Sequence, residues 1–574
     1  MEERGGTARW STSTWCEVLA WASIVLAFVV GAVAAVRAGW TPVSDEALIE
    51  LRVRDVPSHL PLVGVYSRFG WSHPGPLQFL LLSVPYRLAG ASSMALLVAT
   101  MAGHLAVLAG AWWLARRIDR IAGWTVLVAL LVVLATTPAD LLRTPWNPYV
   151  ALVAAGALVV AGWSSAERSP WGVLALALLG SLLVQAHVVA LPLVAAVVVA
   201  GLGAMLWRRD GDEAPGVPGR ALLGAALLTA ALWVLPVVDL FVGDPSNSRL
   251  LRSEDGGARE GLSSGIGVLT GSFAWWPSWM RPSTVGQVLV DPRWFVPVWL
   301  CVPIAGAVVA WRRGEGRFLR GSLVVAAALA ATVVTTAAMT GGLFNYLLVE
   351  HRSVSAVALA VGAASLLSLS GERRRPVVAL CGAVVVVALS VVIGVGQVRG
   401  VNPQAGHGAT IRALAGAVQG DVPTDEVLRL SSSPDFRASE VATGLLLQLE
   451  RAGYDVRSGA DDVRRYGRHR LAAAEDADLD LFVATVDARA GLEADGWRIL
   501  AVVDPMDDAV RDELAELDER SARIGERIEE APDATARAEA YRDLQEVADR
   551  RDELEAGRLP MLLAARTAAS SPAG

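Results

Sequence analysis

Two adjacent carboxylates, Asp45 and Glu46, follow the first long apolar segment and open a short stretch of helical pattern. A carboxylate this close to a bilayer surface is costly to desolvate, which makes it a candidate for function. Asp45 is our candidate general base, because an ionised carboxylate can take a proton from an acceptor hydroxyl. Glu46 is the second candidate catalytic residue, but it points elsewhere on a helix, since successive residues are about 100° apart. In the competing interpretation, Ser44 or Asp45 caps the helix and Glu46 complements its dipole.

Other charged residues of the same stretch fall into two groups. Arg52 shares a helix face with Asp45 and is a candidate ligand for a phosphate. Glu50 and Arg54 have the i,i+4 spacing of an ion pair, which we expect to lie on the surface.

A turn with the sequence Trp71-Ser-His-Pro-Gly-Pro follows in the same loop. His73 in this turn could bind a phosphate, an acceptor or, together with Asp45, a metal ion. Arg68, just before the turn, could contact a phosphate. A divalent cation is therefore a candidate cofactor, with Asp45 and His73 as its ligands. The competing interpretation is an ordinary loop with a solvated arginine and a histidine that binds nothing.

Polar residues also interrupt the apolar sequence at the ends of later spans. They are candidate substrate or lipid-phosphate ligands, because they should share one side of the membrane with the first loop. Alternatively, they serve turn geometry, a buried satisfied pair, or an interfacial anchor. The residues are Asn147 in RTPWNPYV, Gln185 and His187 in VQAHVV, and His351 and Arg352 in LLVEHRSV.

Three tryptophans lie close together in SFAWWPSWM, within a second long polar segment. Trp275, Trp276 and Trp279 could stack on sugar rings or on a lipid chain, as a lid over the site. Tryptophans near a membrane more commonly belong to the aromatic belt, which is the competing interpretation.

The composition places these residues in a membrane protein. The 574 residues are 53% hydrophobic, with mean hydropathy +0.44, and many apolar runs have the length needed to cross a hydrocarbon core. The three cysteines have neither metal-ligand nor disulfide-framework spacing, and no basic face indicates a nucleic-acid partner. We expect a polytopic α-helical protein of about eleven spans, at roughly 17–38, 92–115, 121–140, 145–163, 171–187, 188–207, 219–242, 294–311, 320–340, 348–370 and 376–396.

The placement of arginine predicts the orientation, because cytoplasmic loops carry an excess of basic residues. With a cytoplasmic N-terminus, the arginine clusters between spans fall inside, and the long loops 39–91 and 243–293 fall outside. An odd number of spans then places the C-terminal residues outside as well. The apolar stretch 76–90 is short for a span, so we expect it to lie along the membrane surface.

The chain changes character near residue 400. Residues 1–399 are expected to form the transmembrane domain, and residues 400–574 an extracytoplasmic α/β domain, because strand-like and helical patterns alternate there. DEVLRLSSS, LDLFVATV and GWRILAVVD read as strands, and SEVATGLLLQLERAG as an amphipathic helix. The charged segment 507–557 predicts a helical hairpin, and the final TAASSPAG a disordered tail.

The order of these motifs resembles the GT-C superfamily of membrane glycosyltransferases over the first two-thirds of the chain. It is most similar to the bacterial aminoarabinose and protein-mannosyl transferases and related lipopolysaccharide glycosyltransferases. Asp45-Glu46 matches the family's acidic pair after the first span. His73-Pro74 stands where members have a lysine-proline or related turn, and Asn147-Pro148 where many have aspartate-proline. The Arg-only, Ala-rich composition is typical of an actinobacterial member.

The resemblance implies an EC 2.4-class enzyme that moves a sugar from a polyprenyl-phosphate donor to a cell-envelope glycan, lipid or protein. It implies a multi-pass plasma-membrane protein with its active site on the outer face. Three other functions stay open: a flippase or transporter for a lipid-linked glycan, an envelope glycan polymerase or ligase with a diphosphate-linked donor, and a silent scaffold. The absence of an evident internal repeat favours the enzyme over the transporter.

Overall fold

The computed structural model divides the chain into two compact units. The helical unit comprises Met1–Gly39 and Val53–Asn402, and the α/β unit comprises Trp40–Arg52 and Pro403–Gly574. Helix α2 (Ser44–Asp55) is therefore divided between the two units. The predicted domain boundary at residue 400 did not include this division. The structure describes residues 12–67, 69–207, 216–243, 245–253, 259–281, 295–340, 343–370, 375–473, 476–530, 534–555 and 558–567.

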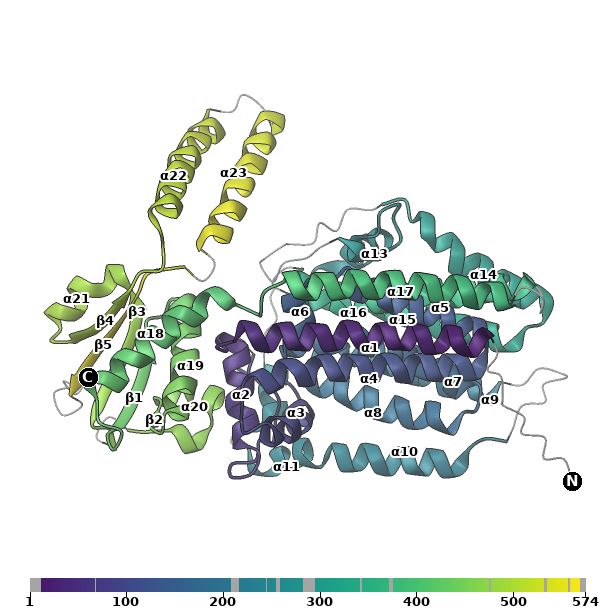
Figure 1. Cartoon of the computed structure of the whole chain (residues 1–574), viewed down its shortest axis with the longest axis horizontal. Coiled ribbons are helices and arrows are strands. Elements are labelled where there is room, and N and C mark those ends of the chain that lie inside the picture. Colours follow the sequence, from purple (N-terminus) through teal and green to yellow (C-terminus); the bar gives the residue numbers. More distant parts are fainter. Residues whose placement is uncertain are drawn as a thin grey trace, which may run out of the picture. The chain divides into compact units, whose positions relative to one another are not determined.

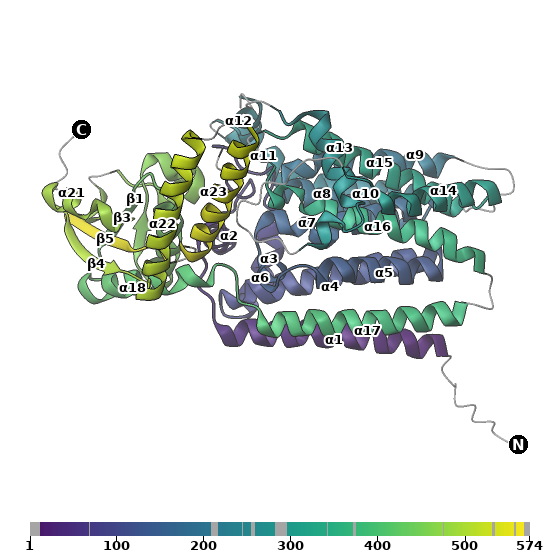
Figure 2. The same cartoon turned by 90° about the horizontal axis from the view of Figure 1, so that it is seen from above.

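The helical unit is a bundle of long apolar helices (Figures 1 and 2). Among the described residues, seven helices are long and apolar enough to cross a membrane, or eight if α10 and α11, which meet at 41°, form one span. The chain is thus a multi-pass membrane protein, as predicted, while the number eleven stays a prediction. The helices are α1 (Thr12–Ala38), α4 (Met94–Ile118), α5 (Arg120–Ala135), α7 (Ala151–Ala166), α8 (Pro170–Ala186), α9 (Leu191–Leu206), α10 (Gly219–Leu232), α11 (Val234–Val242), α14 (Cys301–Arg313), α15 (Gly316–Ala338), α16 (Val349–Leu367) and α17 (Arg375–Arg399).

Helix α7 lies at the centre of the bundle, with every residue buried. Small residues allow its neighbours to come close: a Cβ on Gly156 would lie 2.9 Å from the Cβ of Ser353 in α16. The Ser353 hydroxyl accepts a hydrogen bond from the Gly156 backbone N–H at 3.0 Å. Close packing of small residues is how helices associate in lipid, where the hydrophobic effect gives no preference for contact between them.

The first and last long helices, α1 and α17, lie side by side and run in the same direction (Figures 1 and 2). Ser23 donates to Ser390 at 3.2 Å, and Ala27 faces Gly394 one turn further along each helix. Beyond the helix ends, the Asn402 side-chain amide donates to the carbonyls of Ala35 and Gly39, both at 2.8 Å. The chain therefore leaves α1 and α17 at the same end of the bundle.

Shorter elements follow α1 and α11. Helix α3 (Leu77–Leu88) buries Phe79 and Tyr86 and exposes Leu81, Val84 and Leu88. Its 12 residues extend about 18 Å, which is less than a bilayer core, so the expectation of a surface helix is consistent with the structure. In the second long loop, α12 (Asn247–Ser253), α13 (Gly261–Ser272) and the 3-10 turn η3 (Ser278–Met280) are described, and α13 packs against α15.

The α/β unit contains a five-stranded sheet in the order β2-β1-β3-β5-β4. Its strands are β1 (Val427–Ser432), β2 (Asp455–Arg457), β3 (Leu479–Thr485), β4 (Arg498–Val503) and β5 (Met561–Thr567). β1 is parallel to β2 and β3, and β5 is antiparallel to β3 and β4. Helices α18 (Ala405–Asp421) and α19 (Phe436–Arg451) pack together, and α19 also packs on β1 and β3. α20 (Val463–Tyr466) and α21 (Arg489–Ala494) lie in the connections.

The predicted helical hairpin is present as α22 (Asp508–Glu529) and α23 (Ala534–Glu555). A buried seam at seven-residue spacing joins the two helices: Val510, Leu517 and Ile524 face Ala540, Val547 and Leu554. The domain does not end there, because β5 follows and enters the sheet between β3 and β4. A strand buried on both faces lacks polar alternation, so its pattern gives no sign of a strand. Of the predicted tail, residues 568–574 lie outside the described residues.

Candidate functional site

The acidic segment after α1 is part of the α/β unit. The Trp40 indole donates to the Pro403 carbonyl at 2.9 Å, and Arg412 donates to the Thr41 hydroxyl at 2.6 Å. At the other end of the segment, Arg52 donates to the carbonyls of Arg464 and Arg465, both at 2.9 Å. These contacts give Arg52, our predicted phosphate ligand, a structural partner.

Two glutamates of α2 are buried in this unit. Glu46 accepts a hydrogen bond from the Gln404 side chain at 3.0 Å. Glu50 is completely buried, and Arg451 donates to it at 2.5 Å. The expectation that Glu50 lies on a solvated surface is wrong, because Arg451, at the end of α19, comes from a distant part of the sequence to pair with it. Glu46, predicted as catalytic, has at least one contact that holds α2 in place.

Asp45 lies at the first turn of α2 and is half-buried. It follows Ser44, whose φ of 50° is unusual for a residue with a side chain. Helix α19 supplies a second carboxylate here, since the Ser44 side chain hydrogen-bonds to Glu440. One turn further along α19, a Cβ on Gly444 would lie 3.0 Å from the Pro42 carbonyl oxygen, so this helix packs closely against the start of the segment.

The Glu440 carboxyl holds its proton more tightly than an ordinary glutamate. Burial raises the pKa of the Glu440 carboxyl to about 7; the hydrogen bond from Ser44 opposes this shift and the negative charge of Asp45 adds to it. A carboxyl group with a pKa near 7 beside a second carboxylate can act as a general acid or base at neutral pH. Sequence reasoning missed Glu440, because a glutamate on an amphipathic helix carries no sign of its distant partner.

Glu440 gives the protein a predicted dependence on pH. The folded state binds the Glu440 proton more tightly than the unfolded chain, whose carboxyl has the ordinary pKa near 4.5. Its stabilising contribution is therefore complete below pH 4.5, falls as the pH rises to about 7, and then stays level. Glu440→Gln should flatten this part of the stability curve. The measurement is the denaturant midpoint of both proteins from pH 5 to 8, with exposed Glu493→Gln as control; equal slopes in wild type and Glu440→Gln would contradict it.

In the helical unit, His73 lies in a tight loop against the end of α8. Its backbone N–H donates to Val65, and Gly64 donates to its carbonyl, both at 2.8 Å. The His73 ring Nδ1 accepts a hydrogen bond from the Val188 N–H at 3.3 Å, and its ring centroid lies 4.7 Å from that of His187. Burial, reinforced by His187, lowers the pKa of His73 well below its usual value. His73 is therefore a neutral donor rather than a cation at physiological pH.

Gln185 and Asn147 hold the neighbouring turns together. Gln185 is completely buried, accepts from the Leu77 N–H at 3.3 Å and donates to the Leu232 carbonyl at 2.9 Å. A Cβ on Gly75 would overlap the Gln185 side chain, so a larger residue at that position would have to displace it. The Asn147 amide donates to the Ala186 carbonyl at 2.9 Å. These contacts hold both side chains in the fold, and a contact of either with substrate stays a prediction.

The start of α16 lies beside the turn that contains Asn147, because the rings of Trp146 and Tyr346 are 4.9 Å apart. His351 shares a 3.2 Å hydrogen bond with Thr336. Arg352 donates to the carbonyls of Thr136 at 3.1 Å and Trp279 at 2.9 Å. The structure thus gathers His73, Asn147, Gln185, His187, His351 and Arg352 at one end of the helical bundle.

The three predicted lid tryptophans separate into two kinds. Trp279 is buried, and its indole donates to the Ser272 carbonyl at 2.9 Å. Trp275 and Trp276 are 74% and 57% exposed. A lid formed by these two stays a prediction. Arg68 lies outside the described residues.

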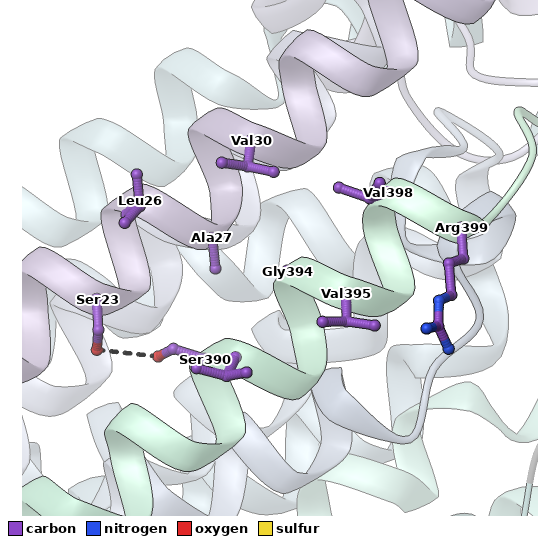
Figure 3. A pocket seen from close by; sticks show the side chains of 10 residues that line it. Ser23, Leu26, Ala27, Val30, Ser390, Gly394, Val395, Val398 and Arg399 are labelled. Atoms are coloured by element: carbon purple, nitrogen blue, oxygen red, sulfur yellow. Dashed lines mark hydrogen bonds between the residues drawn. The ribbon is translucent and has the colours of Figure 1, made fainter.

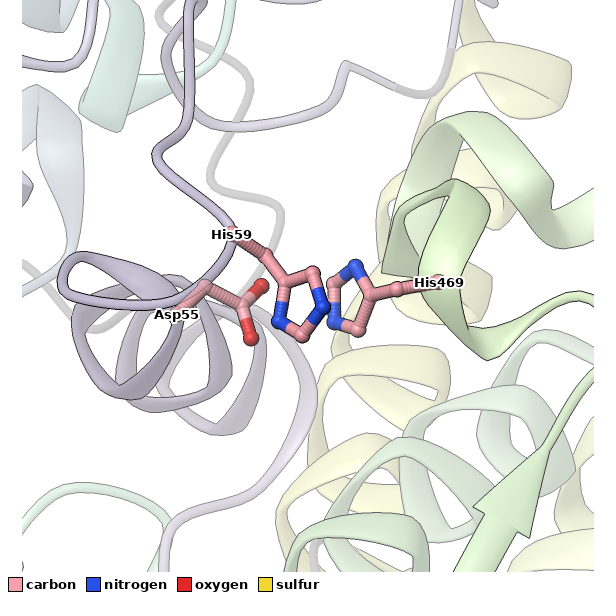
Figure 4. A group of neighbouring side chains, drawn as sticks. All are labelled: Asp55, His59 and His469. Carbon is pink, nitrogen blue, oxygen red and sulfur yellow. The ribbon is translucent and has the colours of Figure 1, made fainter.

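A carboxylate–imidazole pair that we did not predict, Asp55 and His59, lies at the C-terminal end of α2. Figure 4 shows the side chains of Asp55 and His59 pointing toward one another, and the His59 backbone N–H donates to the Asp55 carbonyl at 2.7 Å. Oxygen and imidazole nitrogen are ligand types of divalent cations such as zinc. The predicted metal ligands Asp45 and His73 are assigned to different units, so the role of either in binding a metal stays a prediction.

Comparison with known proteins agrees with the fold predicted above. The structure is similar to ArnT from Cupriavidus metallidurans in the apo state, with a TM-score of 0.52 and 13% sequence identity over 86% of this chain and 97% of that one. The chain therefore has a fold like that of ArnT, which agrees with the predicted resemblance. No protein-family model matches the sequence, and no curated protein does.

Proposed function

We propose that this protein is a membrane glycosyltransferase that moves a sugar from a polyprenyl-phosphate donor to a cell-envelope acceptor on the outer face of the membrane. The observation that carries the proposal is the GT-C fold with a carboxylate, Asp45, at the first turn after α1. The neighbouring Glu440 carboxyl supports it, because its pKa is raised to about 7 and a group that titrates near neutral pH can give or take a proton.

In the proposed reaction, Asp45 takes the proton of the acceptor hydroxyl. The hydroxyl oxygen forms a bond to the anomeric carbon of the sugar, while the bond from that carbon to the phosphate oxygen breaks. The bonding electrons leave with the polyprenyl phosphate. Because the acceptor attacks opposite the departing phosphate, the configuration at the anomeric carbon is inverted. Protonated Glu440 would hydrogen-bond to its neighbours without adding a second negative charge beside Asp45.

The proposed reaction site lies outside the cytoplasm. The arginine bias places the N-terminus inside, and α1 and α17 run in the same direction. Two spans that run in the same direction are separated by an odd number of others, so the total from α1 to α17 is odd. This parity supports an extracytoplasmic α/β unit, since the chain enters it directly after α17.

The proposal is tested with the full-length protein in proteoliposomes and a series of radiolabelled polyprenyl-phosphate sugars. We expect one donor to lose its sugar, with stoichiometric release of polyprenyl phosphate and label in an envelope extract used as the acceptor. Movement of intact donor between leaflets would instead identify a flippase. Transfer only from diphosphate-linked donors would identify a polymerase or ligase, and no turnover of any donor would favour a scaffold.

A further inference from the structure

A groove opens between α1 and α17 on the side of the helical unit (Figure 3). It has a volume of about 430 Å³ and is lined almost entirely by apolar side chains, among them Leu26, Val30, Val391 and Val395. Such a volume is in the range of small-molecule sites. Several of these residues are exposed, as expected for a groove that faces lipid rather than water.

Polar groups occur at both limits of the groove. At one limit the hydroxyls of Ser23 and Ser390 are hydrogen-bonded to each other (Figure 3). At the other limit lies Arg399, the last residue of α17. Arg399 is exposed, and across the described parts of the chain no hydrogen bond or ion pair joins it. The groove therefore extends from the uncharged Ser23–Ser390 pair to the Arg399 cation, which has no partner among the described residues.

The length of the groove matches a single leaflet. Nine residues of helix separate Ser390 from Arg399, which corresponds to about 14 Å at 1.5 Å per residue. Half of a hydrocarbon core of about 30 Å is about 15 Å. A lipid chain that reaches the serine pair would therefore place its headgroup at the level of Arg399.

We infer that this groove binds one phospholipid with an anionic headgroup, its acyl chain between α1 and α17 and its phosphate on Arg399. The guanidinium suits a phosphate because it offers several donors in a planar arrangement. Gly394 keeps the groove open: its nearest neighbour, Ala27, is 3.7 Å from the position of a Cβ. The inference does not depend on the proposed function, because none of the residues that line the groove is a candidate donor ligand.

The test uses phosphatidylglycerol with a photoreactive group in its acyl chain, added to the full-length protein in phosphatidylcholine vesicles. We expect cross-links on the α1 and α17 peptides, with unlabelled phosphatidylglycerol competing about fivefold better than phosphatidylcholine, the effect of a single interfacial cation. Arg399→Gln should remove this preference. Arg37→Gln should keep it, because Arg37 is an exposed arginine in the last turn of α1 that does not line the groove.

A second pair of variants tests the acyl-chain site. Gly394→Leu should fill the groove and reduce cross-linking severalfold, whereas Gly396→Leu, two residues away with open space around it, should not. Equal competition by the two phospholipids in the wild type would overturn the inference. So would cross-links outside α1 and α17, or stronger displacement by polyprenyl phosphate, which would make the groove part of the donor site.

Discussion

Asp45→Asn is expected to lower the rate of sugar transfer by about 10²–10⁴-fold, the contribution that general-base catalysis typically makes. The amide cannot take the acceptor proton, although it has nearly the same shape. Folding should be preserved, because asparagine is as good as aspartate at the start of a helix. Removing the charge should also lower the pKa of Glu440, since Asp45 is one of the groups that raise it. The measurement is single-turnover transfer with the active donor.

Glu46→Gln is the matched control for Asp45→Asn. Glu46 is buried and accepts a hydrogen bond from Gln404, so its replacement should affect the folding of the α/β unit more than the chemical step. Near-normal transfer by Asp45→Asn would remove Asp45 as the base. A folded but inactive Glu46→Gln protein, beside an active Asp45→Asn protein, would exchange the roles within the pair.

Arg451→Met should destabilise the α/β unit by about 2–4 kcal/mol. The substitution removes the cation that pairs with Glu50, whose side chain is 0% exposed. Loss of one partner from a buried ion pair lowers the free energy of unfolding, because the other charge stays buried and uncompensated. The loss should be at the lower end of the usual range because the Arg451 side chain is 30% exposed and so is screened by water. The measurement is the denaturant concentration at which the full-length protein becomes sensitive to protease.

Arg457→Met provides the comparison for this variant. Arg457 pairs with Asp455 in the same unit, but both side chains are partly exposed, at 34% and 50%. Its loss should change the stability by about 0.5 kcal/mol or less. Equal effects of the two substitutions would show that Glu50 does not depend on Arg451.

The membrane helices could be predicted from sequence because each one is a continuous apolar run whose length is set by the bilayer. The strands β1, β3 and β4 and the hairpin α22–α23 also have local patterns, and all are present. The sheet strand β5 could not be found this way, because most of its residues are buried and its sequence lacks alternating polar and apolar residues.

The surroundings of the candidate site were beyond sequence reasoning for a related reason. Glu46 and Glu50 have the spacing of a solvated helix face, and nothing nearby indicates that Gln404 and Arg451 bury them. Equally, the local sequence around Gln185 and Asn147 does not show that their side chains hydrogen-bond to backbone groups of neighbouring turns. Polar residues of this kind can be assigned only when their partners are known.

The division of α2 between two units has a consequence for the order in which the protein is made. Residues 40–52 leave the ribosome before residues 403–574, yet both belong to the same unit. Until the later residues are made, Glu46 and Glu50 lack the side chains that bury them. In a chain truncated before Arg451, helix α2 would lack the partner of Glu50. Cellular quality control could recognise this incompletely folded helix. Residues 40–52 therefore reach their folded surroundings only after residues 403–574 have been made.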